Sequence, residues 1–494
     1  MREARPKRRR ATAGGLLPAL ALAALAGACG SNGGRGDEDT ADSHTDAGAG
    51  ADADTDTGAD AEAEDGADAD GDGDADGDAD DGGGPCVEPT AEEQAALDAA
   101  VHAFLTGADD TLLDNYDATF GHICFDAVAR AIRGWPLTGD TPAGVVVEDT
   151  YVAPLLAGAL RLAVYVPASA VIDGTARVPL IVWLHWAGGT GTIDSMLVRS
   201  AELLGAIIVA PTAPSTCDWS ADEECASQVR GAIGYVKARY PVDHDRVYVT
   251  GFSMGGRGSF TNALAYPDEF AGVLPVAGSI GAIHGTLDPA VHEAYVPPHV
   301  ENAFQLRTAL ITGLVDNEYL VAQNTAAAGA FADLGYDFRW IPLAGVGHAL
   351  PAPEWEPAMS WIAEKVRDPY PREVIYNQAE FASSRYDDLF FNEVWKTNVF
   401  WVRIDARGDD TMPARVAGWL DGSAFVLETA DVSSLTVLLA DELVDLDAPV
   451  SIVVNGTALF DGPVARDPRF ALAHARAREE RSMVFASEVP IAVP

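Results

Sequence analysis

The sequence predicts an α/β fold, a doubly wound and mostly parallel sheet with helices on both faces. A disordered acidic linker precedes it and a small all-β, sandwich-like domain follows. Three observations lead to this prediction. Short apolar runs alternate with helical patterns between residues 160 and 366. A glycine-rich turn at 251–256 joins one such run directly to a helix. After residue 371, short alternating runs recur between Gly and Asp.

The composition is acidic and uneven. The 494 residues carry 32 Lys and Arg against 75 Asp and Glu, a net charge of −43, and 48% of them are hydrophobic. Such an acidic chain repels phosphate backbones, so we expect no nucleic-acid partner. The predicted parts are a leader at 1–28, a linker at 29–85, a helical flank at 86–150, an α/β domain at 151–370 and a β-domain at 371–494.

The first 28 residues resemble the leader of a bacterial lipoprotein. Six Lys and Arg precede an apolar run at 11–25, which is shorter than the roughly 20 residues that a transmembrane helix needs. Small residues then lead to Cys29, although Leu25 lies four residues before it. We therefore expect lipidation of Cys29, export, and anchoring in the outer membrane or at the cell surface. The alternative is a cleaved secretory leader with an incidental cysteine.

The linker is a low-complexity acidic segment. Between residues 36 and 85 it holds 20 Asp and Glu and no Lys or Arg. It cannot bury enough apolar surface to offset its ordering entropy, and its like charges extend it to roughly 40 Å or more. Residues 68–73 look like half an EF-hand loop, but Ala79 stands where a bidentate Glu is needed. We therefore expect no calcium site, and no metal elsewhere.

Four cysteines remain after Cys29, an even number suited to an oxidising compartment. Cys217 and Cys225 are close enough to close one loop, and Cys86 with Cys124 would hold the start of the folded part against its first helices. Three pairings are possible; we expect this local one, and free buried thiols are the alternative.

The folded body begins with helices predicted at 91–105 and 125–133, which carry no catalytic signature. The run at 178–184 is almost fully apolar, as expected for a strand covered on both faces. The other strands are predicted at 160–166, 206–210, 246–250, 272–276, 310–313 and 338–343, and the helices between or after them at 226–240, 255–266, 322–334 and 355–366.

The most informative motif is Gly251-Phe-Ser253-Met-Gly255, which directly follows the strand at 246–250. A serine on such a strand–turn–helix lies on a sharp turn, and its neighbours must be small so that strand and helix can approach. The helix N-terminus then directs its amides at developing negative charge. The motif predicts Ser253 as a nucleophile; the alternative is a glycine-rich turn without catalytic role.

An acid and a histidine follow in the order typical of this motif. Asp316 comes just after the strand at 310–313, at the end of a parallel sheet where sites assemble. His348 lies in the loop after the next strand. The other histidines after Ser253 precede Asp316 or lie in the C-terminal domain. We expect His348 as base and Asp316 as its orienting acid, with Glu318 as the alternative acid.

The oxyanion donors are expected at the end of the strand at 178–184. One donor would be the backbone N–H of Ala187, or that of Trp186, and the other the N–H of Met254, the residue after the nucleophile. His185 is expected to hold this loop by hydrogen bonds rather than to act as a second base.

A longer stretch carries a resemblance to a known family. Tyr240-Pro-Val-Asp-His-Asp-Arg-Val-Tyr-Val-Thr-Gly-Phe-Ser-Met-Gly-Gly-Arg-Gly, together with residues 266–279, resembles the α/β-hydrolase esterases. Within them it is similar to the secreted predicted-peptidase, polyhydroxybutyrate-depolymerase-like or feruloyl-esterase-like group. The resemblance covers about residues 160–366.

The resemblance implies a triad of Ser253, Asp316 and His348. Trp186 departs from the family, which usually has Gly at that position. A large side chain there is expected to narrow the acyl pocket and to favour short acyl groups.

The C-terminal domain contains five short alternating runs with Gly and Asp between them, which predict a β-sandwich. It looks like the β-domain that often follows this hydrolase type. Packing against the hydrolase is favoured over sugar binding, because no aromatic platform is evident.

Together these features predict an exported, surface-anchored, monomeric serine hydrolase. It would cleave carboxylic esters, polymer- or carbohydrate-linked ones among the candidates, through an acyl-enzyme and without metal or organic cofactor. The alternatives are a serine peptidase with the same triad and a catalytically inactive surface-binding lipoprotein.

Overall fold

The computed structural model describes most of the chain after residue 85. The described ranges are 86–134, 142–170, 177–215, 217–219, 223–280, 296–378, 396–409 and 413–494. The predicted leader, Cys29 and the acidic linker lie outside them. All described residues belong to one compact unit. Within these ranges, no helix combines the length and the apolar character needed to cross a membrane.

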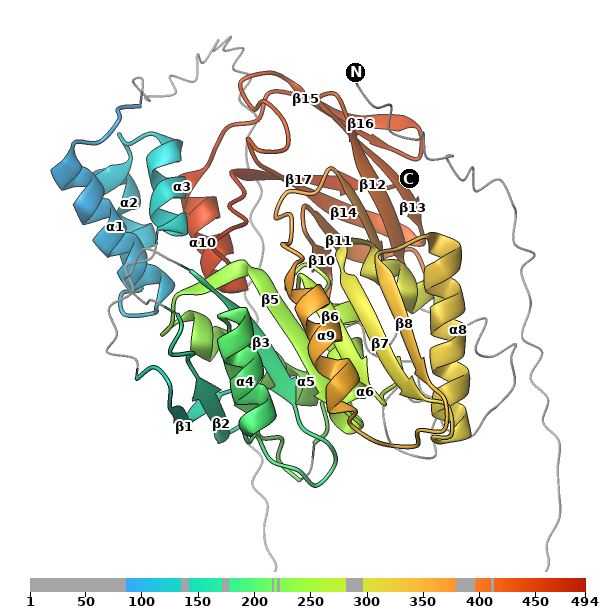
Figure 1. Ribbon diagram of the computed structural model, residues 1–494. Coiled ribbons are helices and arrows are strands. Elements are labelled where there is room, and N and C mark those ends of the chain that lie inside the picture. The colour runs from blue at the N-terminus through green and yellow to red at the C-terminus, as the bar shows by residue number, and fades with distance from the viewer. Residues whose placement is uncertain are drawn as a thin grey trace, which may run out of the picture. The chain divides into compact units, whose positions relative to one another are not determined.

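The central element is an eight-stranded sheet with the order β1-β2-β4-β3-β5-β6-β7-β8 (Figure 1). Strands β3 to β8 pair in parallel, and β1 and β2 extend the β4 edge in antiparallel pairing. The mostly parallel sheet is therefore confirmed. The strands are β1 (Val146–Val152), β2 (Ala159–Tyr165), β3 (Val178–Leu184), β4 (Ile207–Pro211), β5 (Val242–Phe252), β6 (Gly272–Val276), β7 (Arg307–Gly313) and β8 (Phe338–Leu343).

Helices cover both faces of this sheet. Alternate residues of β3 point to opposite sides, so Leu180 and Val182 belong to one buried cluster and Ile181 and Trp183 to another. The first cluster includes side chains of α5 (Glu223–Lys237), α6 (Met254–Ala265) and α8 (Glu318–Leu334). The second includes side chains of α4 (Ser195–Leu204) and α9 (Ala352–Ala363), which lie in front of the strands in Figure 1.

The N-terminal helices form a separate small core. The buried side chains of α1 (Ala91–Leu105), α2 (Leu112–Phe120) and α3 (Phe125–Arg133) pack with those of α10 (Pro468–Arg478), a helix of the C-terminal region (Figure 1). A capping box between Thr90 and Glu93 starts α1. The flank therefore packs on the C-terminal region.

The C-terminal domain is a sandwich of two sheets, as predicted. Trp401 and Phe425 lie edge to face in its buried core, with ring centroids 5.1 Å apart. One sheet has the order β10 (Asn398–Val399), β11 (Val402–Arg407), β14 (Val432–Leu439) and β17 (Ser487–Ala492). The other has the order β16 (Thr457–Gly462), β15 (Val450–Val454), β13 (Ala424–Ala430), β12 (Arg415–Asp421) and β9 (Glu373–Asn377).

Both expected cysteine pairs are disulfide-bonded in the structure, Cys86 with Cys124 and Cys217 with Cys225. The first bond links the start of the described chain to the residue that precedes α3. The second links a loop after β4 to the first turn of α5.

Candidate active site

Ser253 occupies a sharp turn between β5 and α6. Its backbone has φ 59° and ψ −116°, in the positive-φ region that non-glycine residues seldom enter. Such a conformation costs about 1–3 kcal/mol and persists only where the surroundings enforce it. Here the N–H of Ser253 donates to the carbonyl oxygen of Val276 at 2.9 Å, and its own carbonyl accepts from the N–H of Arg257 at 2.9 Å.

The two motif glycines are required by close approach of the backbone. A Cβ atom at Gly255 would lie 1.9 Å from the carbonyl oxygen of Leu184, the last residue of β3. A Cβ atom at Gly251 would lie 2.5 Å from the carbonyl oxygen of Gly255. Only glycine therefore lets α6 start so close to the ends of β3 and β5.

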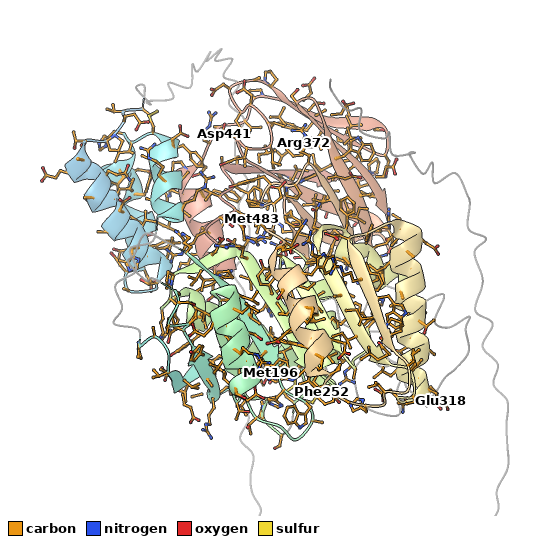
Figure 2. The ribbon with its side chains drawn as sticks, viewed as in Figure 1. Met196, Phe252, Glu318, Arg372, Asp441 and Met483 are labelled. Atoms are coloured by element: carbon orange, nitrogen blue, oxygen red, sulfur yellow. A yellow bond between two sulfur atoms is a disulfide. The ribbon has the colours of Figure 1, made fainter. Side chains whose placement is uncertain are left out.

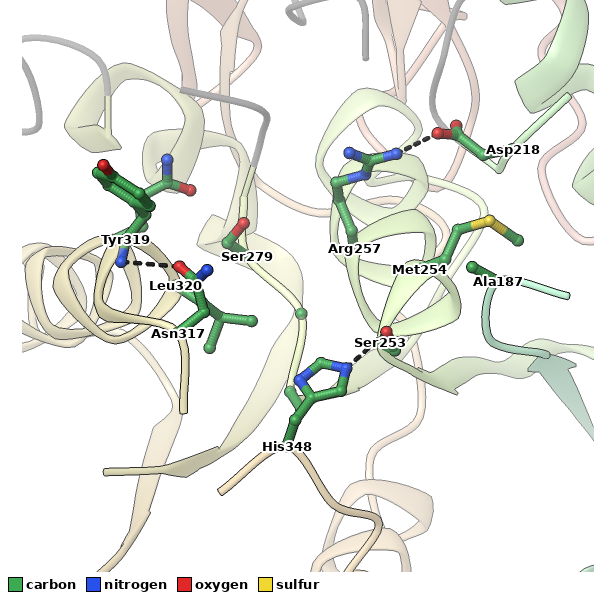
Figure 3. Close-up of a pocket in the computed structure, with 13 residues that line it drawn as sticks. Ala187, Asp218, Ser253, Met254, Arg257, Ser279, Asn317, Tyr319, Leu320 and His348 are labelled. Atoms are coloured by element: carbon green, nitrogen blue, oxygen red, sulfur yellow. Dashed lines mark hydrogen bonds and ion pairs between the residues drawn. The ribbon is translucent and has the colours of Figure 1, made fainter. Parts of the chain in front are cut away.

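The structure brings Ser253, His348 and Asp316 into one hydrogen-bonded chain. The Nε2 atom of His348 lies 2.7 Å from Ser253 Oγ, a contact drawn in Figure 3. The Nδ1 atom lies 2.8 and 3.0 Å from the two carboxylate oxygens of Asp316. A carboxylate can only accept here, so Nδ1 carries the proton and Nε2 accepts from the serine hydroxyl. The alternative acid, Glu318, is the first residue of α8.

Two neighbouring loops position the acid and the histidine. The N–H of Leu314 donates to Leu343 O, and the N–H of Val315 to Val346 O, both at 3.0 Å. These bonds tie the loop after β7 to the loop after β8. The side chain of Asp316 is only 3% exposed and that of His348 is 45% exposed, so the ring reaches solvent while its partner is covered. Figure 2 places Phe252 and Glu318, neighbours of the site, at the same end of the sheet.

A cavity of about 280 Å³ opens beside Ser253 and His348 (Figure 3). Much of its lining is polar, including Ser279, Asn317 and Gln323. Arg257, one turn along α6 from Ser253, lines it and forms an ion pair with Asp218. The volume of the cavity is at the lower end of the range found for small-molecule sites.

Ala187 and Met254 line this cavity together with Ser253. The N–H of Met254 belongs to the first turn of α6, where amides have no acceptor within the helix. Both residues thus lie near the nucleophile, Ala187 on the loop after β3 and Met254 at the start of α6.

The side chain of Trp186 lies outside the cavity and not inside it as expected. Its side chain is 44% exposed, does not line the cavity, and packs edge-on against Phe252 at a centroid distance of 6.2 Å. The residue of this loop with positive φ is Gly188, at 76°. Contrary to the expectation, the Trp186 indole therefore does not narrow the cavity beside Ser253.

His185 holds the loop, as expected. Its ring accepts at Nε2 from the N–H of Ala213 at 3.1 Å, which places the proton on Nδ1, 2.7 Å from the carbonyl oxygen of Trp186. Burial lowers the pKa of His185, so the ring stays neutral.

Sequence reasoning missed Asp218, Trp219 and Arg257. Of these, only Arg257 could have been found from the sequence. It follows Ser253 by four residues, and residues four apart on a helix share a face. Within the described ranges, no three or more His, Cys, Asp or Glu side chains form a group that could hold a metal ion.

Comparisons with known proteins agree with the expected resemblance. The family described as "Putative esterase" matches residues 233–378, which include Ser253, Asp316 and His348. "Feruloyl esterase B" of Neurospora crassa is 32% identical over 125 residues, 22% of this chain and 41% of the relative. "Poly(3-hydroxyalkanoate) depolymerase C" of Paucimonas lemoignei is 42% identical over 53 residues, 11% of this chain and 13% of the relative.

A third relative matches over a longer stretch. "Probable acetylxylan esterase A" of Neosartorya fischeri is 24% identical over 173 residues, 32% of this chain and 45% of the relative. The chain thus spans less than half the length of the curated relatives it matches. Within residues 233–378 the resemblance to the esterases is confirmed, and these matches support carboxylic ester hydrolysis.

Proposed function

We propose that this protein is a serine hydrolase of carboxylic esters. The observation that carries the proposal is the hydrogen-bonded chain from Asp316 through His348 to Ser253, on a turn that exposes the serine at the end of the sheet. The esterase family match over residues 233–378 supports the same chemistry.

The geometry supports a two-step reaction. Ser253 Oγ attacks the ester carbonyl carbon while His348 Nε2 takes its proton, and Asp316 stabilises the imidazolium that forms. The oxyanion of the tetrahedral intermediate accepts from the N–H of Met254 and from that of Ala187 or Trp186. His348 then protonates the leaving alcohol, and the acyl group stays on Ser253. Water, deprotonated by His348, then attacks the acyl carbon. The bond to Ser253 Oγ breaks, His348 returns the proton to that oxygen, and the acid leaves.

The cavity favours a small or polar acyl group. Its volume is about 280 Å³, and Arg257 and Asn317 offer hydrogen-bond donors. The alcohol would remain outside, which suits esters carried on a polymer or a carbohydrate. The similarity to a feruloyl esterase, a poly(3-hydroxyalkanoate) depolymerase and an acetylxylan esterase makes feruloyl, hydroxyalkanoate and acetylxylan esters reasonable first substrates.

The test compares wild type with Ser253→Ala and His348→Ala. Each variant should lower kcat for p-nitrophenyl acetate by roughly 10³-fold or more, with nearly unchanged thermal unfolding. A fluorophosphonate probe should label wild type and not Ser253→Ala. A wild type that neither reacts with the probe nor hydrolyses any ester would make this an inactive binding protein. Faster cleavage of peptide anilides than of esters would make it a peptidase.

We further propose that the enzyme is exported and works as a monomer at the cell surface, held by lipid on Cys29 through the acidic linker. The basic leader and the residues before Cys29 support this. Expressed in a Gram-negative host, wild type should incorporate labelled fatty acid and sediment with membranes, and Cys29→Ser should do neither. A wild type that is unlabelled and fully soluble would contradict the anchor, and light scattering of the detergent-extracted protein would test the monomer.

A further inference from the structure

We propose that Trp219 is a positioning residue for the oxyanion hole and that the Cys217–Cys225 disulfide holds it in place. The inference rests on the proposed esterase function, because it concerns the donors that would stabilise the tetrahedral intermediate. Trp219 does not line the cavity, so it would act through the backbone that does.

The first observation is the set of hydrogen bonds below the oxyanion loop. Trp219 is fully buried, and its indole N–H donates to the carbonyl oxygen of His185 at 2.9 Å. The His185 ring meets the indole edge-on, with centroids 4.9 Å apart. That ring in turn donates from Nδ1 to the carbonyl oxygen of Trp186 at 2.7 Å. Two successive carbonyls of the loop are therefore fixed by side chains that pack on each other.

These two carbonyls belong to the peptide units that supply the candidate donors. A peptide unit is planar, and its N–H points opposite to its C=O. Fixing the carbonyl of His185 therefore orients the N–H of Trp186, and fixing the carbonyl of Trp186 orients the N–H of Ala187. The Trp219 indole orients the N–H of Trp186 through its own hydrogen bond to the carbonyl of His185. It orients the N–H of Ala187 indirectly, by packing against the His185 ring that binds the carbonyl of Trp186.

The second observation concerns the helix that carries the other donor. A Cβ atom at Gly258 would lie 2.1 Å from the Cβ of Trp219, so α6 passes directly over this residue. The side-chain amide of Asn262 donates to the carbonyl oxygen of Trp219 at 2.9 Å. Because α6 begins at Met254, Trp219 contacts both backbone segments that carry the expected donors.

The third observation is the covalent attachment of Trp219. Cys217, two residues before it, is bonded to Cys225 in the first turn of α5. The buried side chain of Gln228 donates to the carbonyl oxygen of Cys225 at 2.7 Å and to that of Asp218 at 3.5 Å. The segment is thus tied to a helix of the core by a covalent bond and hydrogen bonds, which limits how far Trp219 can move.

The first test removes the indole N–H and compares two matched variants. Trp219→Phe keeps an aromatic ring and loses the donor. The control is Trp401→Phe in the β-domain, because Trp401 is also fully buried and donates to a backbone carbonyl, that of Pro371, at 2.8 Å. Loss of one oxyanion donor costs about 10²–10³ in kcat, so a misdirected donor should cost about 10- to 100-fold.

The expected result separates positioning from general stability. Trp219→Phe should lower kcat for p-nitrophenyl acetate by that factor, change KM less than about threefold, and weaken a trifluoromethyl ketone inhibitor in proportion, since the inhibitor forms the same oxyanion. Trp401→Phe should lower the thermal midpoint while keeping kcat and inhibitor affinity within about twofold. Equal kcat and inhibitor affinity in Trp219→Phe and wild type would overturn the proposal.

The second test removes each of the two disulfides in turn. It still tests the proposal if Trp219→Phe does not fold. Cys217→Ser with Cys225→Ser should lower kcat and inhibitor affinity together, by about 10-fold. Cys86→Ser with Cys124→Ser, at the N-terminal helices, should lower only the thermal midpoint. Equal effects of the two pairs on kcat would overturn the role of the Cys217–Cys225 bond. Failure of the proposed function would look different, because wild type itself would then hydrolyse no ester.

Discussion

The backbone of Ser253 depends on its neighbours more than on the serine itself. Its positive φ is maintained because α6 starts against the ends of β3 and β5, and that approach requires glycine at 251 and 255. The backbone conformation of Ser253 is therefore set by how closely α6 packs against the ends of β3 and β5.

Gly255→Ala tests this dependence directly. The new Cβ would lie 1.9 Å from the carbonyl oxygen of Leu184 and 2.8 Å from that of His185, so α6 must move away from β3. We expect a loss of about 1–3 kcal/mol or more of unfolding free energy and a fall in kcat/KM of at least about 10²-fold. Urea unfolding and ester kinetics measure the two effects.

The matched control is Gly329→Ala in α8. Nothing lies within 4 Å of a Cβ at that exposed helical position. Alanine there should stabilise the protein by up to about 1 kcal/mol and leave kcat/KM unchanged. Similar activity losses in both variants would show that the turn at Ser253 is not sensitive to the contact with Leu184.

A second prediction at this scale concerns chain length. Trp186 lies outside the cavity, whereas Leu320 lines it. Trp186→Gly should therefore keep the ratio of kcat/KM for acetyl and octanoyl esters within about threefold. Leu320→Ala should shift the ratio toward octanoyl by about 10-fold, since apolar pocket changes of this kind are worth about 1–3 kcal/mol. The opposite pattern would place the acyl chain against Trp186.

At the scale of elements, buried charges join the C-terminal domain to the hydrolase. Arg367, after α9, donates to Asp245 at 2.7 Å, to Glu480 at 3.1 Å and to Ser482 at 2.7 Å. Burial alone would raise the pKa of Glu480, but the cations around it, Arg367 first, hold it well below its usual range. These ion pairs connect the loop after α10 with the start of β5.

Arg367→Met should be strongly destabilising, because in a buried site it leaves Asp245 without its cation and Glu480 with Lys237 as its remaining permanent cation. Breaking a buried pair in this way costs about 3–5 kcal/mol, which a guanidinium unfolding curve measures. Arg199→Met is the control, since Arg199 is 59% exposed and pairs with Glu356 at the surface, and should cost less than about 1 kcal/mol. Equal losses would mean that the buried pair adds nothing beyond a surface one.

The elements differ in how well the sequence predicts them. The strands β3, β4 and β6 are continuous apolar runs, because helices cover both of their faces, and they were predicted within a few residues. β5 was predicted only at 246–250, because its first residues include Asp243 and Asp245. β1 was missed, because Tyr151 is its single buried residue and no alternation marks it. It also begins at Val146, within the range assigned to the helical flank. α10 was missed although Asp467 and Pro468 are standard start signals.

The candidate site shows the same limit. Ser253, Asp316 and His348 were predictable because each follows the end of a strand within a short motif. Trp219 was not, because its contact with His185 joins segments 34 residues apart and depends on how α6 packs. The position of the Trp186 indole was mispredicted for a related reason, since the turn of the loop is set at Gly188.

At the scale of the whole molecule, the described residues form one unit whose two main parts share a buried, charged interface. His244 belongs to this interface and faces Lys237, Glu480 and Arg367. Burial, with Lys237 as the next cause, lowers its pKa to about 4. Near pH 6.5, where a histidine in the unfolded chain takes up a proton, His244 in the folded protein is therefore still neutral.

The sign of the pH effect follows from this difference. An unfolded histidine has a pKa of about 6.5, so between about pH 6.5 and pH 4 the unfolded chain binds a proton that the folded chain does not. Stability should fall as the pH falls through this window, by about 3 kcal/mol from His244 alone, at 1.36 kcal/mol for each pKa unit. Glu480, with its lowered pKa, adds a further loss only below about pH 4.5.

The last prediction uses this window. His244→Gln removes the titrating group and keeps a polar side chain, so it should flatten the decline of the thermal midpoint between pH 6.5 and 4.5, even if it lowers the midpoint at pH 7. His122→Gln is the control, because the His122 side chain is 53% exposed and lies on the N-terminal flank, and it should leave the slope as in wild type. Differential scanning calorimetry at half-unit pH steps provides the measurement. If all three proteins lose stability with the same slope, the acid sensitivity does not arise from His244, and the buried His474, whose pKa is lowered to about 3, becomes the next group to test.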